Sequence, residues 1–155
     1  MSQAAAPARL VGMSSQQSPL KRVLAAILAL TMGGNGVAML AAGRWWYGAV
    51  PGVTRTGPFN PHFVKDIGAA YLVAGAAFAW LAARATPAAR GAAAAAAAFL
   101  GLHAAVHLAE AAGAPAGLAD LARDFPGVFL PALLAAWTAA TPYQPREPRH
   151  AQSPA

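Results

Sequence analysis

The segment at residues 91–112 has the sequence GAAAAAAAFLGLHAAVHLAEAA, in which two histidines and one glutamate interrupt an otherwise apolar run. As an α-helix it would cover about 30 Å, which is the thickness of the hydrocarbon core of a bilayer. Alanine is the best helix former, and its small side chain permits close contact between helices. The segment therefore predicts a helix that crosses a membrane.

The composition of the whole chain supports a membrane protein. Hydrophobic residues make up 57% of the 155 residues, charged residues make up 10%, and the mean hydropathy is +0.43. A soluble domain carries about 25% charged residues, so these charges are too few to cover a surface that faces water. The absence of cysteine excludes disulfides, thiolate catalysis and iron–sulfur clusters. Basic residues lie scattered at segment ends and form no stripe, which excludes nucleic acid as a partner.

Apolar segments of spanning length recur and predict an all-α fold, a bundle of four transmembrane helices. Asn60 followed by Pro61 is typical of an N-cap and first helical residue, which sets the start of the second helix. Pro131 lies in the fourth segment and is tolerated in a membrane helix when neighbouring groups satisfy the freed carbonyl. The expected helices cover residues 20–42, 61–84, 88–112 and 125–141.

These helices form a single expected membrane domain at residues 20–141. The two chain ends, residues 1–19 and 142–155, are rich in Ser, Gln, Ala and Pro and predict disordered tails. The first apolar segment also resembles a signal peptide, because Lys21 and Arg22 precede it and small residues follow. Its length of about 20 residues favours a retained helix, and a cleaved signal peptide remains the alternative.

Glycines in the first and second segments predict that each of these helices packs tightly against a neighbour. Three glycines interrupt the first helix and two lie seven residues apart in the second: Gly33, Gly34 and Gly36, and Gly68 and Gly75. The first group is not a phosphate-binding loop, since no Lys-Ser/Thr follows it. Small residues at such spacings let membrane helices approach each other closely.

The distribution of Lys and Arg predicts the orientation in the membrane. With a cytoplasmic N-terminus, the inner side holds Arg9, Lys21, Arg22, Arg84, Arg90, Arg146 and Arg149. The outer side then holds only Arg44, Arg55, Lys65 and Arg123. Trp45, Trp46 and Tyr47 form an aromatic belt at the outer end of the first helix. We therefore expect both termini in the cytoplasm.

Ionisable and polar residues converge at the outer side of this arrangement. His103, His107 and Glu110 are spaced i, i+4 and i+7, so they share one helix face. Asn35 in the first helix, and His62 and Asp66 at the start of the second, fall in the same outer third of the membrane. We expect these six residues to form one polar cluster open toward the periplasm.

Three kinds of site suit such a cluster. His103, His107 and Glu110 are possible ligands of a divalent metal, although the zincin pattern HExxH is absent. Imidazoles and carboxylates also bind a quinone headgroup or relay protons. The third interpretation is a structural network of interhelical contacts. Asp120, Arg123 and Asp124 are interpreted separately, as capping and interface charges of the fourth helix.

The layout resembles a known group of proteins. The stretch PGV–TGPFNPHFVKDIGAAYL entering the second helix, the short inner loop with Arg84 and Arg90, and HAAVHLAE in the third helix resemble small four-helix inner-membrane proteins of proteobacteria. These are similar in layout to the broad DoxX-like group, some of which are linked to quinone-coupled sulfur oxidation. The resemblance implies a bacterial inner membrane and supplies no set of catalytic residues.

We therefore expect a multi-pass inner-membrane protein, a bundle or accessory subunit without catalysis of its own. Its expected partners are the lipid bilayer and another membrane protein subunit. The alternative is a quinone-linked or metal-binding redox component that uses the His/Glu cluster of the third helix.

Overall fold

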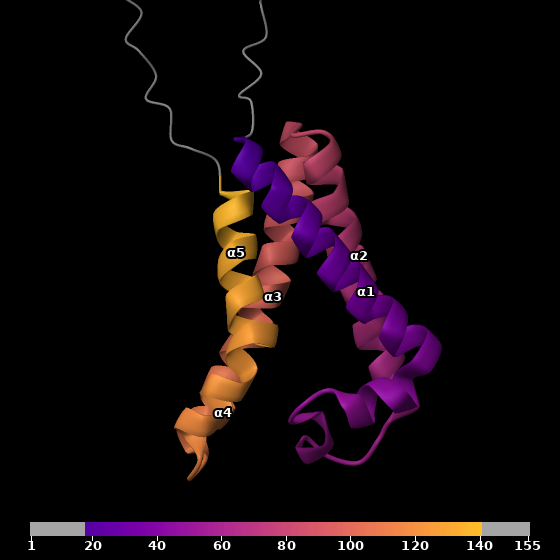
Figure 1. Cartoon of the computed structure of the whole chain (residues 1–155), viewed down its shortest axis with the longest axis vertical. Coiled ribbons are helices and arrows are strands. Elements are labelled where there is room, and N and C mark those ends of the chain that lie inside the picture. Colours follow the sequence, from indigo (N-terminus) through magenta and orange to yellow (C-terminus); the bar gives the residue numbers. More distant parts are fainter. Residues whose placement is uncertain (1–17, 141–155) are drawn as a thin grey trace, which may run out of the picture.

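The computed structural model describes residues 18–140, and every element among them is helical (Figure 1). In chain order they are α1 (Pro19–Ala49), the short 3-10 helix η1 (Val53–Arg55), α2 (Pro61–Ala83), α3 (Pro87–Gly113), α4 (Gly117–Asp124), the π-helical turn η2 (Phe125–Phe129) and α5 (Leu130–Ala139). The tails expected at residues 1–19 and 142–155 lie outside the described residues, apart from Ser18 and Pro19, which begin α1.

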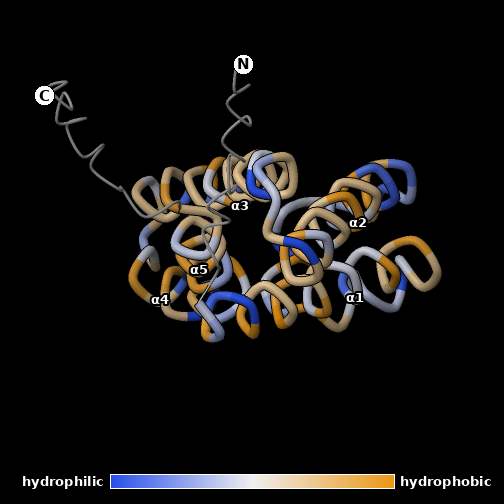
Figure 2. The backbone as a smooth tube through the Cα atoms, turned by 90° about the horizontal axis from the view of Figure 1, so that it is seen from above, coloured by the Kyte–Doolittle hydropathy of each residue, from blue (hydrophilic) through white to orange (hydrophobic). Residues whose placement is uncertain are grey.

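Three of these helices are long and apolar enough to cross a membrane, namely α1, α2 and α3. In the most apolar 18 residues of each, only 28%, 33% and 22% of the positions are buried inside the molecule. Most apolar positions in these helices therefore face outward, as a membrane protein requires and as a soluble one avoids. The view along the helices shows hydrophobic residues on all sides of the group (Figure 2).

The same local chemistry starts each of these three helices. Ser18, Asn60 and Thr86 cap α1, α2 and α3 through their side-chain oxygens, and a proline follows each cap. Asn60 Oδ1 accepts hydrogen bonds from the backbone N–H groups of His62 and Phe63, both at 3.1 Å. The start predicted for the second helix at residue 61 is thus found at Pro61.

A kink divides α1. The sequence predicts a helix that ends at residue 42, and Ala42 has non-helical backbone angles, with φ −138° and ψ 41°. The helix resumes beyond it and continues to Ala49, so its aromatic end belongs to α1. Asn35 Oδ1 accepts a hydrogen bond from Trp46 Nε1 at 2.8 Å, and this bond joins the two sides of the kink.

Helices α1 and α2 form a hairpin whose contact depends on glycine. A Cβ atom built on Gly36 would lie 2.7 Å from the carbonyl oxygen of Gly68, and one on Gly75 would lie 2.7 Å from the backbone nitrogen of Gly33. The two backbones therefore touch directly, and the structure shows that the neighbour of each glycine-containing helix is the other. Gly34 faces open space, so it takes no part in this contact.

The second hairpin consists of α3 and the segment that packs on it. Helix α4, η2 and α5 follow one another without interruption from residue 117 to residue 139, whereas the sequence predicts one helix over 125–141. Pro126 lies in the π-helical turn and Pro131 follows it. Proline lacks the N–H of a regular helix and its ring displaces the carbonyl four residues earlier, which accounts for the irregular turn.

The two hairpins meet at one end and spread toward the other (Figure 1). At the closed end, Lys21 Nζ donates a hydrogen bond of 2.8 Å to the carbonyl oxygen of Ala140 and lies 5.1 Å from the centre of a Trp137 ring. At the open end lie η1, which follows α1, and α4, which follows α3. The candidate site lies between these two elements.

Candidate functional site

The site is organised around an ion pair between α3 and α4. His107 Nδ1 lies 2.8 Å from Asp124 Oδ2, and the two side chains are only 21% and 10% exposed. Because α3 and α4 run in opposite directions on either side of a short turn, the last residue of α4 comes back beside the penultimate turns of α3. The pairing therefore closes the turn between the two helices.

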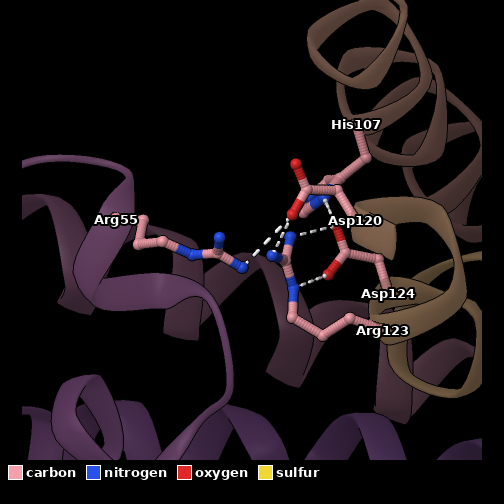
Figure 3. A network of polar contacts seen from close by, with 5 residues as sticks. All are labelled: Arg55, His107, Asp120, Arg123 and Asp124. Carbon is pink, nitrogen blue, oxygen red and sulfur yellow. Dashed lines mark hydrogen bonds and ion pairs between the residues drawn. The ribbon is translucent and has the colours of Figure 1, made fainter. Parts of the chain in front are cut away.

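Arg123 extends the pair into a network (Figure 3). Its Nε and Nη2 atoms donate to the two carboxylate oxygens of Asp124 at 2.6 and 2.9 Å, the two-point geometry that suits a guanidinium and a carboxylate. Its Nη1 atom donates to Asp120 Oδ1. Arg55, which comes from η1 on the other hairpin, donates to the same oxygen at 3.2 Å. One continuous row of charges thus joins the two hairpins at their open end.

The loop that carries Arg55 is shaped for this contact. Gly52 has a φ of +89°, a conformation that favours glycine. A Cβ atom at Gly52 would also lie 2.6 Å from Arg123 Nε, so a larger residue would displace the Arg123 side chain. The hydroxyl of Tyr47 contacts the carbonyl oxygen of Gly57 and holds the loop against the end of α1.

The network shifts the pKa values of two of its members, Asp124 and Arg123. Partial burial acts to raise the pKa of Asp124, but the hydrogen bonds from Arg123 and His107 and the charges beside it outweigh burial, so the pKa lies below its ordinary value. The hydrogen bond with Asp124 raises the pKa of Arg123. Both groups are therefore held in their charged forms.

A pocket of about 340 Å³ lies against this network. Its polar wall comes from η1, α3 and α4, and small residues complete it. The lining residues are Gly52, Arg55, Thr56, His107, Glu110, Ala111, Ala114, Asp120, Arg123 and Asp124. Glu110 has no hydrogen bond or ion pair to any residue that the structure describes.

A row of aromatic rings leads from the site into the helices. The ring of His103 lies 4.8 Å from that of His107, centre to centre, and stacks on Phe99 at 6.4 Å. Tyr71 of α2 meets the edges of Phe99 and His103 at 5.6 and 6.2 Å. His103 is thus half-buried among aromatic side chains, while His107 faces the charged network.

The six residues expected to form one cluster do not all meet. His103, His107 and Glu110 share a face of α3, as their spacing predicts. His62 and Asp66 instead pair with each other at 3.3 Å along α2, with side chains that are 88% and 61% exposed, and neither lines the pocket. The start of α2 belongs to the other hairpin, which spreads away from α3 at this end (Figure 1).

Asn35 also lies apart from the histidines in its contacts. Its amide oxygen accepts from Trp46, and its amide nitrogen lies 3.8 Å from the sulfur of Met39, so both groups are used within α1. Asn35 therefore stabilises the kinked helix. The expected cluster was based on residues that lie at the same depth in the membrane. Side chains at the same depth on different helices can still point in different directions.

The geometry does not favour a metal site. Within residues 18–140, no group of three His, Asp or Glu side chains is arranged to hold a metal ion. His103, His107 and Glu110 therefore do not form a ready ligand set, although the spacing HxxxH suits one. The Nδ1 atom of His107 is already engaged by Asp124.

The residues that sequence reasoning missed are the other members of the charged network that includes His107. Asp120, Arg123 and Asp124 were expected as capping and interface charges, yet they form the centre of the network, and Arg55 was counted only for orientation. The cap of α4 is Ala116, whose side chain makes no capping bond. A signal was present in the D-x-x-R-D spacing, because residues three apart on a helix pair readily.

Comparison with known protein families, with curated proteins and with solved structures found no match for the chain.

Proposed function

We propose that the protein is a multi-pass membrane subunit without catalysis of its own, which acts by contact with another membrane protein. The observation that supports this most is the pairing of most ionisable groups at the open end. Five of them form one connected chain, in the order Arg55, Asp120, Arg123, Asp124 and His107. A catalytic site needs groups left free to reach a substrate, whereas a network in which each member has a partner stabilises a structure.

The proposal includes a fourth crossing of the membrane by η2 and α5. This segment is tied to the other helices at both of its ends. Asp124, just before it, bonds to His107 near one end of α3, and Ala140, just after it, bonds to Lys21 at the start of α1. The segment is thus tied to α3 at one end and to α1 at the other, and its 15 residues run alongside these two helices. Helix α4, which carries the charges, then lies at the membrane surface.

The excess of Lys and Arg supports both termini in the cytoplasm of a bacterial cell, with the network on the periplasmic side. This orientation is tested by fusing alkaline phosphatase or a fluorescent protein to each end and to the loop between α1 and α2. We expect fluorescence at both ends and phosphatase activity in the loop. The reverse pattern would overturn the orientation. The resemblance to the DoxX-like group stays a prediction, because no match to a known family tests it.

The test of the subunit function begins with membranes solubilised in mild detergent. We expect the protein to migrate in a native gel within a complex larger than its own oligomer, and to contain no chromophore, metal or extractable quinone after purification. The double variant His103→Leu/His107→Leu should melt at a lower temperature than the wild type. Its content of chromophore, metal and quinone should be the same as that of the wild type. Stoichiometric quinone or metal in the native protein, lost in this variant, would overturn the proposal.

A quinone-linked redox component is the second candidate, and one observation favours it. The His103 ring stacks among Phe99 and Tyr71 and adjoins His107, which is paired with Asp124. Aromatic rings beside an imidazole–carboxylate pair suit a planar headgroup that exchanges protons. Quinone bound to the purified protein would decide in favour of this function.

A further inference from the structure

We propose that the pocket at the open end binds a phospholipid headgroup that carries both an ammonium and a phosphate group. The first argument is the depth of the pocket. Glu110 lies about 20 residues beyond Arg90 on α3, which is about 30 Å along the helix. This distance equals the thickness of the hydrocarbon core, so the two side chains lie at opposite headgroup layers.

The second argument concerns the carboxylates of the pocket. Asp120 is bonded to Arg55 and Arg123, and Asp124 is bonded to Arg123 and His107. Glu110 lines the same pocket and has no such partner among residues 18–140. A ligand that carries an ammonium group supplies the missing cation, and a primary ammonium brings three N–H donors.

The third argument concerns the guanidinium groups. Arg55 uses one Nη atom to reach Asp120, and its side chain is 63% exposed. A guanidinium has five N–H donors, so most of those of Arg55 remain free to bind phosphate oxygens. The lining of the pocket therefore includes both a cationic and an anionic group. A ligand that carries the two opposite charges, an aminoalkyl phosphate, can pair with both.

The surroundings favour a lipid as the source of this chemistry. The pocket volume of about 340 Å³ is at the small end of ligand sites and suits a headgroup. Leu108 on α3 and Leu118 and Phe125 beside the network are 54%, 85% and 50% exposed. These apolar side chains lie next to the charged residues in sequence and are suited to contact acyl chains.

The proposal is tested with the full-length protein in detergent, titrated with short-chain phosphatidylethanolamine, phosphatidylcholine and phosphatidylglycerol. Binding is measured by native mass spectrometry. Phosphatidylethanolamine should bind about tenfold tighter than phosphatidylglycerol, which lacks the ammonium group. Phosphatidylcholine should fall between them, because its quaternary ammonium has no N–H donors. Equal binding of all three lipids would overturn the proposal.

Two matched variants assign the effect to the pocket. Glu110→Gln should lower the affinity for phosphatidylethanolamine about tenfold and remove the preference over phosphatidylglycerol. Asp66→Asn removes a carboxylate on α2 that does not line the pocket and should leave the affinity unchanged. Glu110 has no hydrogen bond or ion pair to any of residues 18–140, so Glu110→Gln should melt at the wild-type temperature. An unchanged lipid preference in Glu110→Gln would refute the assignment.

A further arm identifies the source of the ligand. Glycerophosphoethanolamine carries the same headgroup without acyl chains, and we expect it to bind at least tenfold more weakly than the lipid. Equal affinity would show that the pocket takes a soluble aminoalkyl phosphate and would overturn the lipid part of the proposal. The lipid-binding measurements do not depend on whether the protein is an accessory subunit. The subunit function is tested separately, by the size of the native complex and by the content of bound cofactors.

Discussion

His107 on α3 and Asp124 at the end of α4 lie 2.8 Å apart, and Asp124 is the more deeply placed of the two. The same carboxylate receives two hydrogen bonds from Arg123. A single aspartate thus holds α3, α4 and, through Arg123 and Asp120, the loop of the other hairpin. The stability of the open end should depend on it.

Replacement of Asp124 by asparagine should lower the free energy of unfolding by about 1–3 kcal/mol, because Arg123 and His107 then lose the charged partner that they share. Thermal unfolding in detergent, followed by circular dichroism, measures the effect. The control is Asp66→Asn, which breaks an exposed pair with His62 and should cost less than about 1 kcal/mol. Equal effects of the two variants would contradict a central role for Asp124.

The low pKa of Asp124 predicts a dependence of stability on pH. Its carboxylate loses its proton more readily in the folded protein than in the unfolded chain, so its contribution is complete above the ordinary pKa of about 3.9. The contribution disappears as the pH falls through the lower pKa of the folded state. The difference in melting temperature between wild type and Asp124→Asn should therefore be constant near pH 7 and shrink below about pH 4. A gap that widens on acidification would show that the carboxylate is not stabilised by its partners.

The contact between α1 and α2 predicts opposite effects for two neighbouring glycines. Gly36→Ala places a methyl group 2.7 Å from the carbonyl oxygen of Gly68, and we expect a loss of about 1–3 kcal/mol from overpacking. Gly34→Ala meets nothing within 4 Å and should be neutral or stabilising, because alanine favours a helix more than glycine does. Both are measured by unfolding in detergent. Similar losses at the two positions would argue against a direct contact of the backbones at Gly36.

The bond between Asn35 and Trp46 predicts a role for one of two adjacent tryptophans. Trp46→Phe removes the donor to the Asn35 oxygen and should cost about 0.5–1.5 kcal/mol. Trp45→Phe is the control, because Trp45 is 67% exposed and should contribute less. The melting temperatures of the two variants give the comparison. A larger loss at Trp45 would mean that the bond to Asn35 does not contribute to the stability of the protein.

The sequence predicts those parts of the fold that depend on residues within a single helix. Capping residues followed by proline set the start of α2, and glycine spacing in α1 and α2 marks a contact that the structure contains. The kink at Ala42 and the early start of the fourth segment have other causes. A hydrogen bond within α1, from Trp46 to Asn35, joins the residues beyond 42 to the rest of the helix. The pairing of Asp120, Arg123 and Asp124 keeps charged residues helical ahead of residue 125.

The candidate site was less predictable, because it depends on how two hairpins lie beside each other. Spacing along α3 correctly places His103, His107 and Glu110 on one face. The position of His62 and Asp66 along α2 does not predict whether their side chains point toward α3. In the structure the two side chains pair with each other. Arg55 reaches Asp120 over a separation of 65 residues, a contact that only the packing of the hairpins creates.

The bond between Lys21 and Ala140 brings the two ends of the described chain to the same corner of the bundle. A chain reconnected there by a short linker and opened between α2 and α3 would keep every contact between helices, since proteins with adjacent ends tolerate such rearrangement. The order in which the hairpins leave the ribosome would then be reversed while the assembled molecule stayed the same. This circular permutant separates the pathway of membrane insertion from the final packing.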